Sequence, residues 1–173
     1  MQPLILRELD EDDEKSFFAG LQEWEGLSSH WHTFIWTSGM PYVDLLNKLK
    51  DDAKGINLEN GRVPHTMFYG FVDGVIVGRV SVRHQLNQRL LHRGGHFGYA
   101  VAPRFRQRGY ATEMVRQALL FIREKLRLPE LLVTCDEENT ASRKIIEKFG
   151  GKFEGKFFDN TDNKWILRYW IKL

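Results

Sequence analysis

Residues 101–112 combine three arginines with a glycine at the junction of a predicted strand and a predicted helix. Arg104, Arg106 and Arg108 precede Gly109, and apolar residues recur at helical spacing after it. The first amides of a helix have no partner within the helix and lie at the positive end of its dipole, so they bind anions. Gly109 would let a ligand approach the backbone, and arginines add charge-assisted hydrogen bonds to phosphate oxygens. The segment therefore predicts a phosphate or pyrophosphate site.

Two better-known nucleotide motifs do not fit this segment. A P-loop needs Gly-Lys followed by Ser or Thr, and the dinucleotide fingerprint needs three glycines, whereas only Gly109 is present, with Ala111 two residues later. On these residues alone, a helix start that carries solvated arginines explains the pattern equally well.

The elements around this segment alternate between strands and helices. Strands are predicted at residues 4–8, 67–72, 75–83, 96–101, 131–135, 152–157 and 164–171. Helices are predicted at residues 10–24, 42–49, 111–126 and 139–149, with Asn139 as an N-cap. Asp73-Gly74 is typical of a tight hairpin turn. The order predicts a fold of the α/β (α+β) class.

Composition limits the class of protein. The chain has 173 residues, of which 42% are hydrophobic, enough for one core, so we expect a single domain over residues 1–173. Lys and Arg number 25 against 23 Asp and Glu, which argues against nucleic acid and membrane partners. No signal peptide or membrane-spanning run is evident, and the one cysteine, Cys135, suits a reducing compartment, so a cytoplasmic location is expected. His30 and His32 lack the neighbours of a metal site, so no metal is expected.

Two motifs resemble a known superfamily. Arg106-x-x-Gly109-x-Ala111 after Val101-x-Pro103 resembles the acetyl-coenzyme A motif of the Gcn5-related N-acetyltransferase (GNAT) superfamily, and the segment from Asn139 to Gly150 is similar to its second cofactor-contacting segment. Residues 83–87, 95–99, 111–114 and 133–136 resemble a bacterial subfamily of predicted acetyltransferases whose substrate is undefined. Residues 98–99 and 109–113 also resemble the branch that acetylates ribosomal protein N-termini.

The resemblance implies a mixed, mostly antiparallel central sheet flanked by helices, with acetyl-CoA as co-substrate. It implies that the backbone of Tyr99 and Val101 pairs with the pantetheine arm and that Asn139 and Ser142 contact it from the second segment. Arg106 stands at the motif's first position, and the pyrophosphate would bind the amides of Gln107, Arg108, Gly109, Tyr110, Ala111 and Thr112.

The implied reaction moves an acetyl group from acetyl-CoA to a primary amine of a small molecule, peptide or protein N-terminus by direct attack. The amine must lose a proton, so a base is expected. His96 and His84 are the candidates for that base, although a hydrogen-bonded structural role explains His96 as well. Asn87 and Trp36 are the candidate acceptor contacts, with Trp24, Trp31 and Phe34 as possible further walls of the pocket, each of which packing alone also explains.

The tyrosine that commonly protonates the thiolate in this superfamily has no counterpart here, because the matching position is Ile146. Cys135, at the end of an apolar strand, is expected to be a buried thiol and not a nucleophile. A catalytically silent CoA-binding or regulatory module is therefore the alternative function, and a homodimer is compatible with the sequence.

Overall fold

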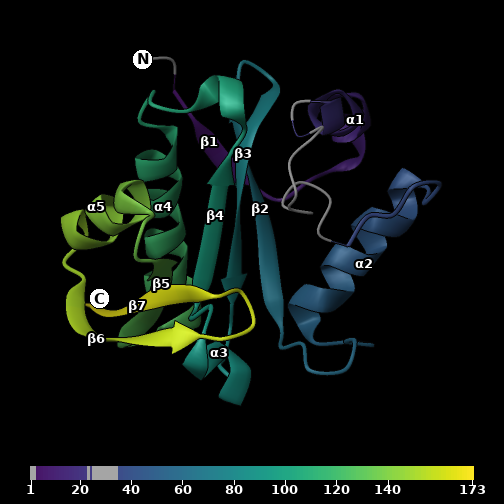
Figure 1. Ribbon diagram of the computed structural model, residues 1–173. Coiled ribbons are helices and arrows are strands. Elements are labelled where there is room, and N and C mark those ends of the chain that lie inside the picture. Colours follow the sequence, from purple (N-terminus) through teal and green to yellow (C-terminus); the bar gives the residue numbers. More distant parts are fainter. Residues whose placement is uncertain (1–2, 23, 25–34) are drawn as a thin grey trace.

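Two antiparallel sheets form the centre of the protein (Figure 1). The computed structural model describes residues 3–22, 24 and 35–173. The first sheet has the order β1 (Ile5–Arg7), β2 (His65–Val72), β3 (Val75–Arg83) and β4 (Phe97–Val101). The second has the order β5 (Glu130–Asp136), β7 (Lys164–Lys172) and β6 (Lys152–Asp159).

The β2–β3 hairpin follows directly from its turn residues. Asp73 and Gly74 both have positive φ, 49° and 75°, as a two-residue turn of this hand requires, and Val72 pairs with Val75. The hairpin prediction is confirmed, and it fixes β2 and β3 as the central strands of the first sheet.

Helices cover both faces of the first sheet. One face packs against α1 (Glu14–Gln22) and α2 (Tyr42–Lys54), and the other against α4 (Tyr110–Phe121) (Figure 1). Each helix contributes to a core on its own side, with Phe17 and Leu45 on the α1/α2 side and Met114 and Ala118 on the α4 side. The remaining long helix, α5 (Thr140–Lys148), packs beside β5.

Two features differ from the elements that the sequence predicts. A short helix, α3 (Gln88–His92), follows β3, and it begins where the Asn87 side chain accepts a hydrogen bond from the amide of Leu90. The predicted helix over residues 111–126 does reach Leu126, but its last five residues, Ile122–Leu126, form a π-helical turn that ends at Arg127 with φ 53°. Both differences arise in short segments, where periodicity carries little information.

The two sheets are joined by hydrogen bonds near the start of β4 and not along a continuous ladder. The His96 amide donates to the Leu132 carbonyl at 2.8 Å, and the Leu132 amide donates to His96 Nδ1 at 2.9 Å. The neighbouring Gly95 has φ 61°, and a Cβ there would lie 2.2 Å from the Leu132 carbonyl oxygen. The close approach of β4 to β5 therefore depends on a glycine at this position.

Beyond this junction, no strand of the described residues pairs with the edge of β4 that faces away from β3, which is called the open edge below. The Arg83 amide donates to the His96 carbonyl and the Ala102 amide to Val77, so the even-numbered residues of β4 pair with β3. In an antiparallel pair the alternate residues point their backbone groups the other way. The backbone groups of Tyr99 and Val101 therefore point toward the open edge.

We expect Gly95→Ala to destabilise the protein far more than Gly150→Ala. Both glycines have positive φ, which costs an alanine about 1–2 kcal/mol, but Gly150 has open space around it, whereas at Gly95 the methyl group collides with the Leu132 carbonyl. The free energy of unfolding, measured with urea, should fall by about 3 kcal/mol or more for Gly95→Ala and by about 1 kcal/mol for Gly150→Ala. Equal losses would show that the sheets do not depend on this contact.

Candidate active site

The loop between β4 and α4 leaves backbone amides free at the start of α4. It contains the 3-10 helix η2 (Pro103–Phe105), and two residues in it have positive φ, Gln107 at 60° and Gly109 at 79°. Gly109 is the N-cap of α4 and has no side chain to cap it, and the first hydrogen bond of the helix runs from Glu113 to Gly109 at 3.1 Å. The amides of residues 110–112 precede that bond, so they are available to an anion.

The three arginines of this loop lie against protein groups. Arg106 Nε donates to the Val101 carbonyl at 3.1 Å, which ties the loop back to the end of β4. The guanidinium groups of Arg104 and Arg108 lie over the Phe105 ring, 4.5 and 5.9 Å from its centre. The free groups at the helix start are therefore backbone amides, while the arginines contact the loop and add positive charge beside it.

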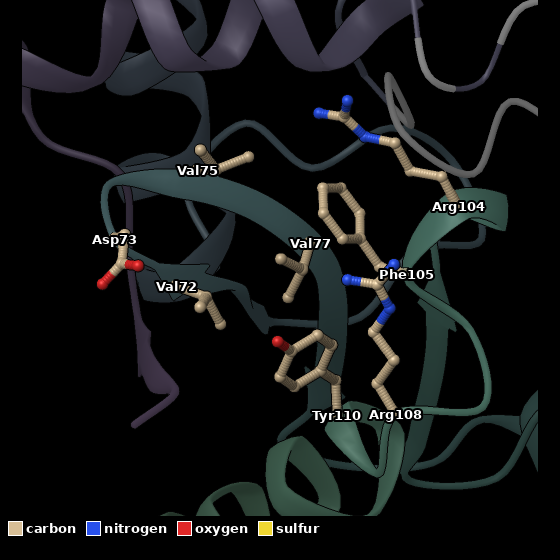
Figure 2. A pocket seen from close by; sticks show the side chains of 8 residues that line it. All are labelled: Val72, Asp73, Val75, Val77, Arg104, Phe105, Arg108 and Tyr110. Carbon is tan, nitrogen blue, oxygen red and sulfur yellow. The ribbon is translucent and has the colours of Figure 1, made fainter. Parts of the chain in front are cut away.

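A shallow pocket of about 320 Å³ lies between this loop and the β2–β3 hairpin (Figure 2). The side chains of Arg108 and Tyr110 line it together with Asp73 and Val77. The Tyr110 side chain, which is buried, points toward the hairpin. The side chains of Arg108 and Tyr110 thus lie on the hairpin side, so only their backbone groups are available at the helix start.

Tyr99 and Ser142 meet across the gap between β4 and α5. The Tyr99 hydroxyl and Ser142 Oγ are 2.9 Å apart, and Asn139 Oδ1 accepts from the Ser142 amide at 3.0 Å. The prediction that Asn139 caps this helix is confirmed. Burial raises the pKa of Tyr99 to about 12, against the opposing effect of the hydrogen bond to Ser142. The phenol therefore stays neutral and is a hydrogen-bond donor beside the open edge of β4.

His96 is held in one protonation state by the sheet junction. Because the Leu132 amide can only donate, Nδ1 is the acceptor and the proton of the neutral ring is on Nε2. Burial lowers the pKa of His96, which favours that neutral ring. In this arrangement the side chain offers a hydrogen-bond donor at Nε2, and a second proton would have to displace the Leu132 hydrogen bond.

The other predicted site residues have partners elsewhere. His84 Nε2 lies 2.9 Å from Thr66 Oγ1, and burial lowers its pKa. Asn87 caps α3 and donates from Nδ2 to the Gly61 carbonyl at 2.9 Å. Trp36 donates from its indole to the Met40 carbonyl at 3.0 Å and packs in the α1/α2 core. The predictions for Trp31, Phe34, His30 and His32 lie outside the described residues.

A polar row on β3 was not predicted from the sequence. Arg79, Ser81 and Arg83 alternate with valines along this central strand, and Arg79 and Ser81 are only 2% and 3% exposed. The signal was present as polar residues at every second position in an apolar strand, but the face on which they lie requires the register of the sheet.

Two side chains near the site, Cys135 and Ile146, offer no reactive group at neutral pH. Burial raises the pKa of the Cys135 thiol to about 11, in agreement with the expected role as a buried apolar group. Ile146, at the position of the superfamily's tyrosine, is buried in the core on the α4 side.

Among the described residues, no group of three His, Cys, Asp or Glu side chains could hold a metal ion. A search of the same residues finds no helix long and apolar enough to span a membrane.

A family model described as an acetyltransferase (GNAT) domain matches residues 3–152. The chain belongs to the GNAT family. Among curated members, L-amino acid N-acetyltransferase AaaT of Escherichia coli (strain K12) is 29% identical over 97 residues, which is 56% of each protein. The uncharacterized N-acetyltransferase YnaD of Bacillus subtilis (strain 168) is 30% identical over 79 residues, 44% of this chain and 46% of YnaD. The aligned residues span about half the length of these relatives.

Solved GNAT structures share the whole fold. A structure of RimL, a ribosomal L7/L12 alpha-N-protein acetyltransferase in complex with coenzyme A, has a TM-score of 0.71 at 14% identity and covers 98% of this chain and 94% of its own. A spermidine N-acetyltransferase SpeG chimera from Vibrio cholerae and hSSAT has a TM-score of 0.63 at 22% identity, with 98% and 95% coverage. The predicted superfamily and its mixed, mostly antiparallel fold are confirmed.

We expect the pH dependence of stability to depend on His96. Its folded pKa lies below the value of about 6.5 in an unfolded chain, so the unfolded chain binds more protons and the free energy of unfolding falls as pH drops below about 6.5. His96→Asn keeps an acceptor for the Leu132 amide but does not titrate. The slope of unfolding free energy against pH should shrink by up to one proton, about 1.4 kcal/mol per pH unit. The exposed His92→Asn is the control, and an unchanged slope for His96→Asn would contradict the neutral ring.

Proposed function

We propose that this GNAT protein transfers an acetyl group from acetyl-CoA to a primary amine by direct attack. The observation that carries the proposal is the adjacency of two unsatisfied backbone surfaces, the uncapped start of α4 and the open edge of β4. Anionic and amide-bearing parts of one ligand can bind them in sequence. Membership of the family supports the same ligand, and the RimL structure was obtained with coenzyme A.

The residues present fit this co-substrate. When bound, acetyl-CoA supplies the acetyl group as an activated thioester. The amides from Gln107 to Thr112 would bind its pyrophosphate, and the backbone of Tyr99 and the amide of Val101 would pair with its pantetheine arm. The Val101 carbonyl is already occupied by Arg106, so that arginine would position the loop rather than contact the arm. Ser142 and Asn139 line the opposite side.

Proton transfer would then depend on few groups. An amine with a pKa near 10 must lose a proton, and His96, as a donor at Nε2, is set to hydrogen-bond and not to accept. His84 has its Nε2 engaged by Thr66. We therefore assign proton removal to water at the half-exposed backbone of Gly98 and Ala100, with His96 as a positioning donor.

The leaving thiolate would be stabilised by Tyr99. A phenol with a pKa of about 12 does not transfer its proton fully to a thiolate whose own thiol has a pKa of about 8.5, but it donates a hydrogen bond to it. That contact would take the place of the superfamily's tyrosine, whose position is occupied here by Ile146. Direct attack also gains from the positioning of two reactants on fixed backbone.

One observation favours a second candidate, a silent CoA-binding module. Ile146 is 1% exposed and supplies no acid at the position that the superfamily commonly uses. This candidate predicts binding of acetyl-CoA without consumption in the presence of any amine.

The first test is thermal unfolding with and without acetyl-CoA, with ATP and NAD as controls. A ligand at 100 times its dissociation constant adds about 2.7 kcal/mol of stability. A selective rise with acetyl-CoA would then be followed by release of free thiol with a panel of amines: L-amino acids, polyamines and N-terminal peptides. No rise would overturn the proposal, and a rise without thiol release would favour the silent module.

We expect Gly109→Glu to abolish the stabilisation by acetyl-CoA. A carboxylate at this N-cap would occupy the anion site and repel the pyrophosphate. Gly150→Glu is the matched control, because Gly150 also has positive φ, 81°, but ends α5 far from its N-terminus. Both variants should lose similar intrinsic stability, and only Gly109→Glu should lose the ligand-dependent shift. Normal binding by Gly109→Glu would show that the loop is not the anion site.

A further inference from the structure

The polar row on β3 faces the side of the sheet that α1 and α2 cover. Arg79 pairs with Tyr69 and Ser81 pairs with Met67, and directly paired residues share a face. Tyr69 and Met67 belong to the α1/α2 core. Arg83 continues the row by alternation. A central strand thus buries the Ser81 hydroxyl and the Arg79 guanidinium group among apolar side chains, and it places the partly buried Arg83 at the end of the same row.

The small residues of β4 lie directly beside this row. Ser81 pairs with Gly98, Arg79 pairs with Ala100, and the Arg83 amide bonds to the His96 carbonyl. Gly98 and Ala100 are half-exposed although their strand lies between β3 and the sheet junction. The row is therefore one strand away from the open edge of β4, about 4.8 Å across.

Arg83 and Ser81 have hydrogen-bonding capacity to spare. Arg83 Nη1 donates to the Gly94 and Gly95 carbonyls at 3.0 and 3.1 Å, which are neutral groups. Burial and the like charge of Arg89 lower the pKa of Arg83 to about 10, so it remains a cation at neutral pH. In the part of the chain that the structure describes, no carboxylate pairs with Arg83, and the buried Ser81 Oγ has no hydrogen-bond partner.

A cation without a carboxylate partner and a buried hydroxyl without a hydrogen-bond partner both cost free energy of folding unless a ligand pairs with them. Buried charges are normally paired, and an unpartnered buried hydroxyl loses free energy relative to water. His96 beside them is neutral and brings no negative charge. An anion that accepts hydrogen bonds from both Arg83 and Ser81 would satisfy the pair, and a planar carboxylate suits a guanidinium group best.

We infer that the acceptor amine also carries a carboxylate, which binds Arg83 and Ser81 while its amino group lies over Gly98 and Ala100. The inference rests on the proposed function and names the substrate class of the same site. A hydrogen bond of about 2.8 Å at each end lets a small α-amino acid bridge from β3 to the open edge of β4. A polyamine, in contrast, would bring further positive charge to Arg83 and Arg79.

The test compares matched acceptors. Thiol release from acetyl-CoA is followed with L-amino acids, with their α-amides and with spermidine, each corrected to equal concentration of free amine. We expect kcat/KM for the acid to exceed that for the amide at least tenfold. An amide or spermidine used as well as the acid would overturn this inference and leave the proposed function intact. Binding of acetyl-CoA with no acetylation of any amine would overturn the proposed function and this inference with it.

Variants separate recognition of the carboxylate from folding, because the measured quantity is the ratio of kcat/KM for the acid to that for the amide. A loss of folded protein lowers both values equally. Arg83→Gln should bring the acid-to-amide ratio close to one, whereas Arg83→Lys should retain part of the preference. Arg89→Gln, which removes an exposed charge near Arg83, is the matched control and should leave the ratio unchanged. Since Arg83 also holds the Gly94–Gly95 turn, Ser81→Ala provides a second variant, with an expected three- to tenfold loss for the acid alone. An unchanged ratio in Ser81→Ala and Arg83→Lys would overturn the inference.

A binding measurement that needs no turnover accompanies these assays. The N-acetylated amino acid, added without coenzyme A, should raise the unfolding temperature of the wild-type chain and of Arg89→Gln equally, and that of Ser81→Ala by less at the same concentration. An equal rise in all three would place the carboxylate elsewhere and contradict the assignment.

Discussion

The two hydrogen bonds between His96 and Leu132 join the two sheets at the start of β4, beside the core that the sheets share. Each sheet is an antiparallel ladder with its own turns. At this point they are joined by one hydrogen bond between backbone groups and one from a backbone amide to a histidine ring nitrogen. Gly95 makes the approach possible, because any side chain there would collide with the Leu132 carbonyl. Because these bonds lie at the start of β4, no described strand pairs with the rest of its outer edge. Unpaired backbone groups inside a fold need partners, and a ligand with amides of its own can supply them.

The anion site also depends on backbone more than on charge. All three arginines of the loop lie against protein groups, Arg106 on a carbonyl and the other two on Phe105. Their charge raises the local potential, but that contribution is screened by salt at exposed positions. The converging amides at the start of α4 are fixed by the positive φ angles of Gln107 and Gly109. Affinity for a pyrophosphate should therefore depend more on loop conformation than on any single guanidinium group.

Sequence reasoning succeeded where the determinants are local. The Asp73-Gly74 hairpin, the helix predicted from residue 111 (observed from Tyr110) and the Asn139 cap each follow from a few adjacent residues. It did not identify the bond between His96 and Leu132, 36 residues apart, because no local pattern encodes it. The same limit applies to Trp165 of β7, which is 44% exposed beside Phe158, because alternation along a strand does not say which face of the sheet is covered.

The two faces of β4 carry side chains of different size. Its odd residues, Phe97, Tyr99 and Val101, are large and pack toward the core that contains α4, with Tyr99 reaching Ser142 of α5. Its even residues, His96, Gly98 and Ala100, are small or fixed by hydrogen bonds and lie beside the polar row of β3. A larger side chain at residue 98 or 100 would cover Ser81 from the β4 side, while a smaller one at residue 99 would remove the contact to α5. The alternation of size along these residues therefore separates a packed face on the α4 side from a face of small, half-exposed residues beside the polar row of β3.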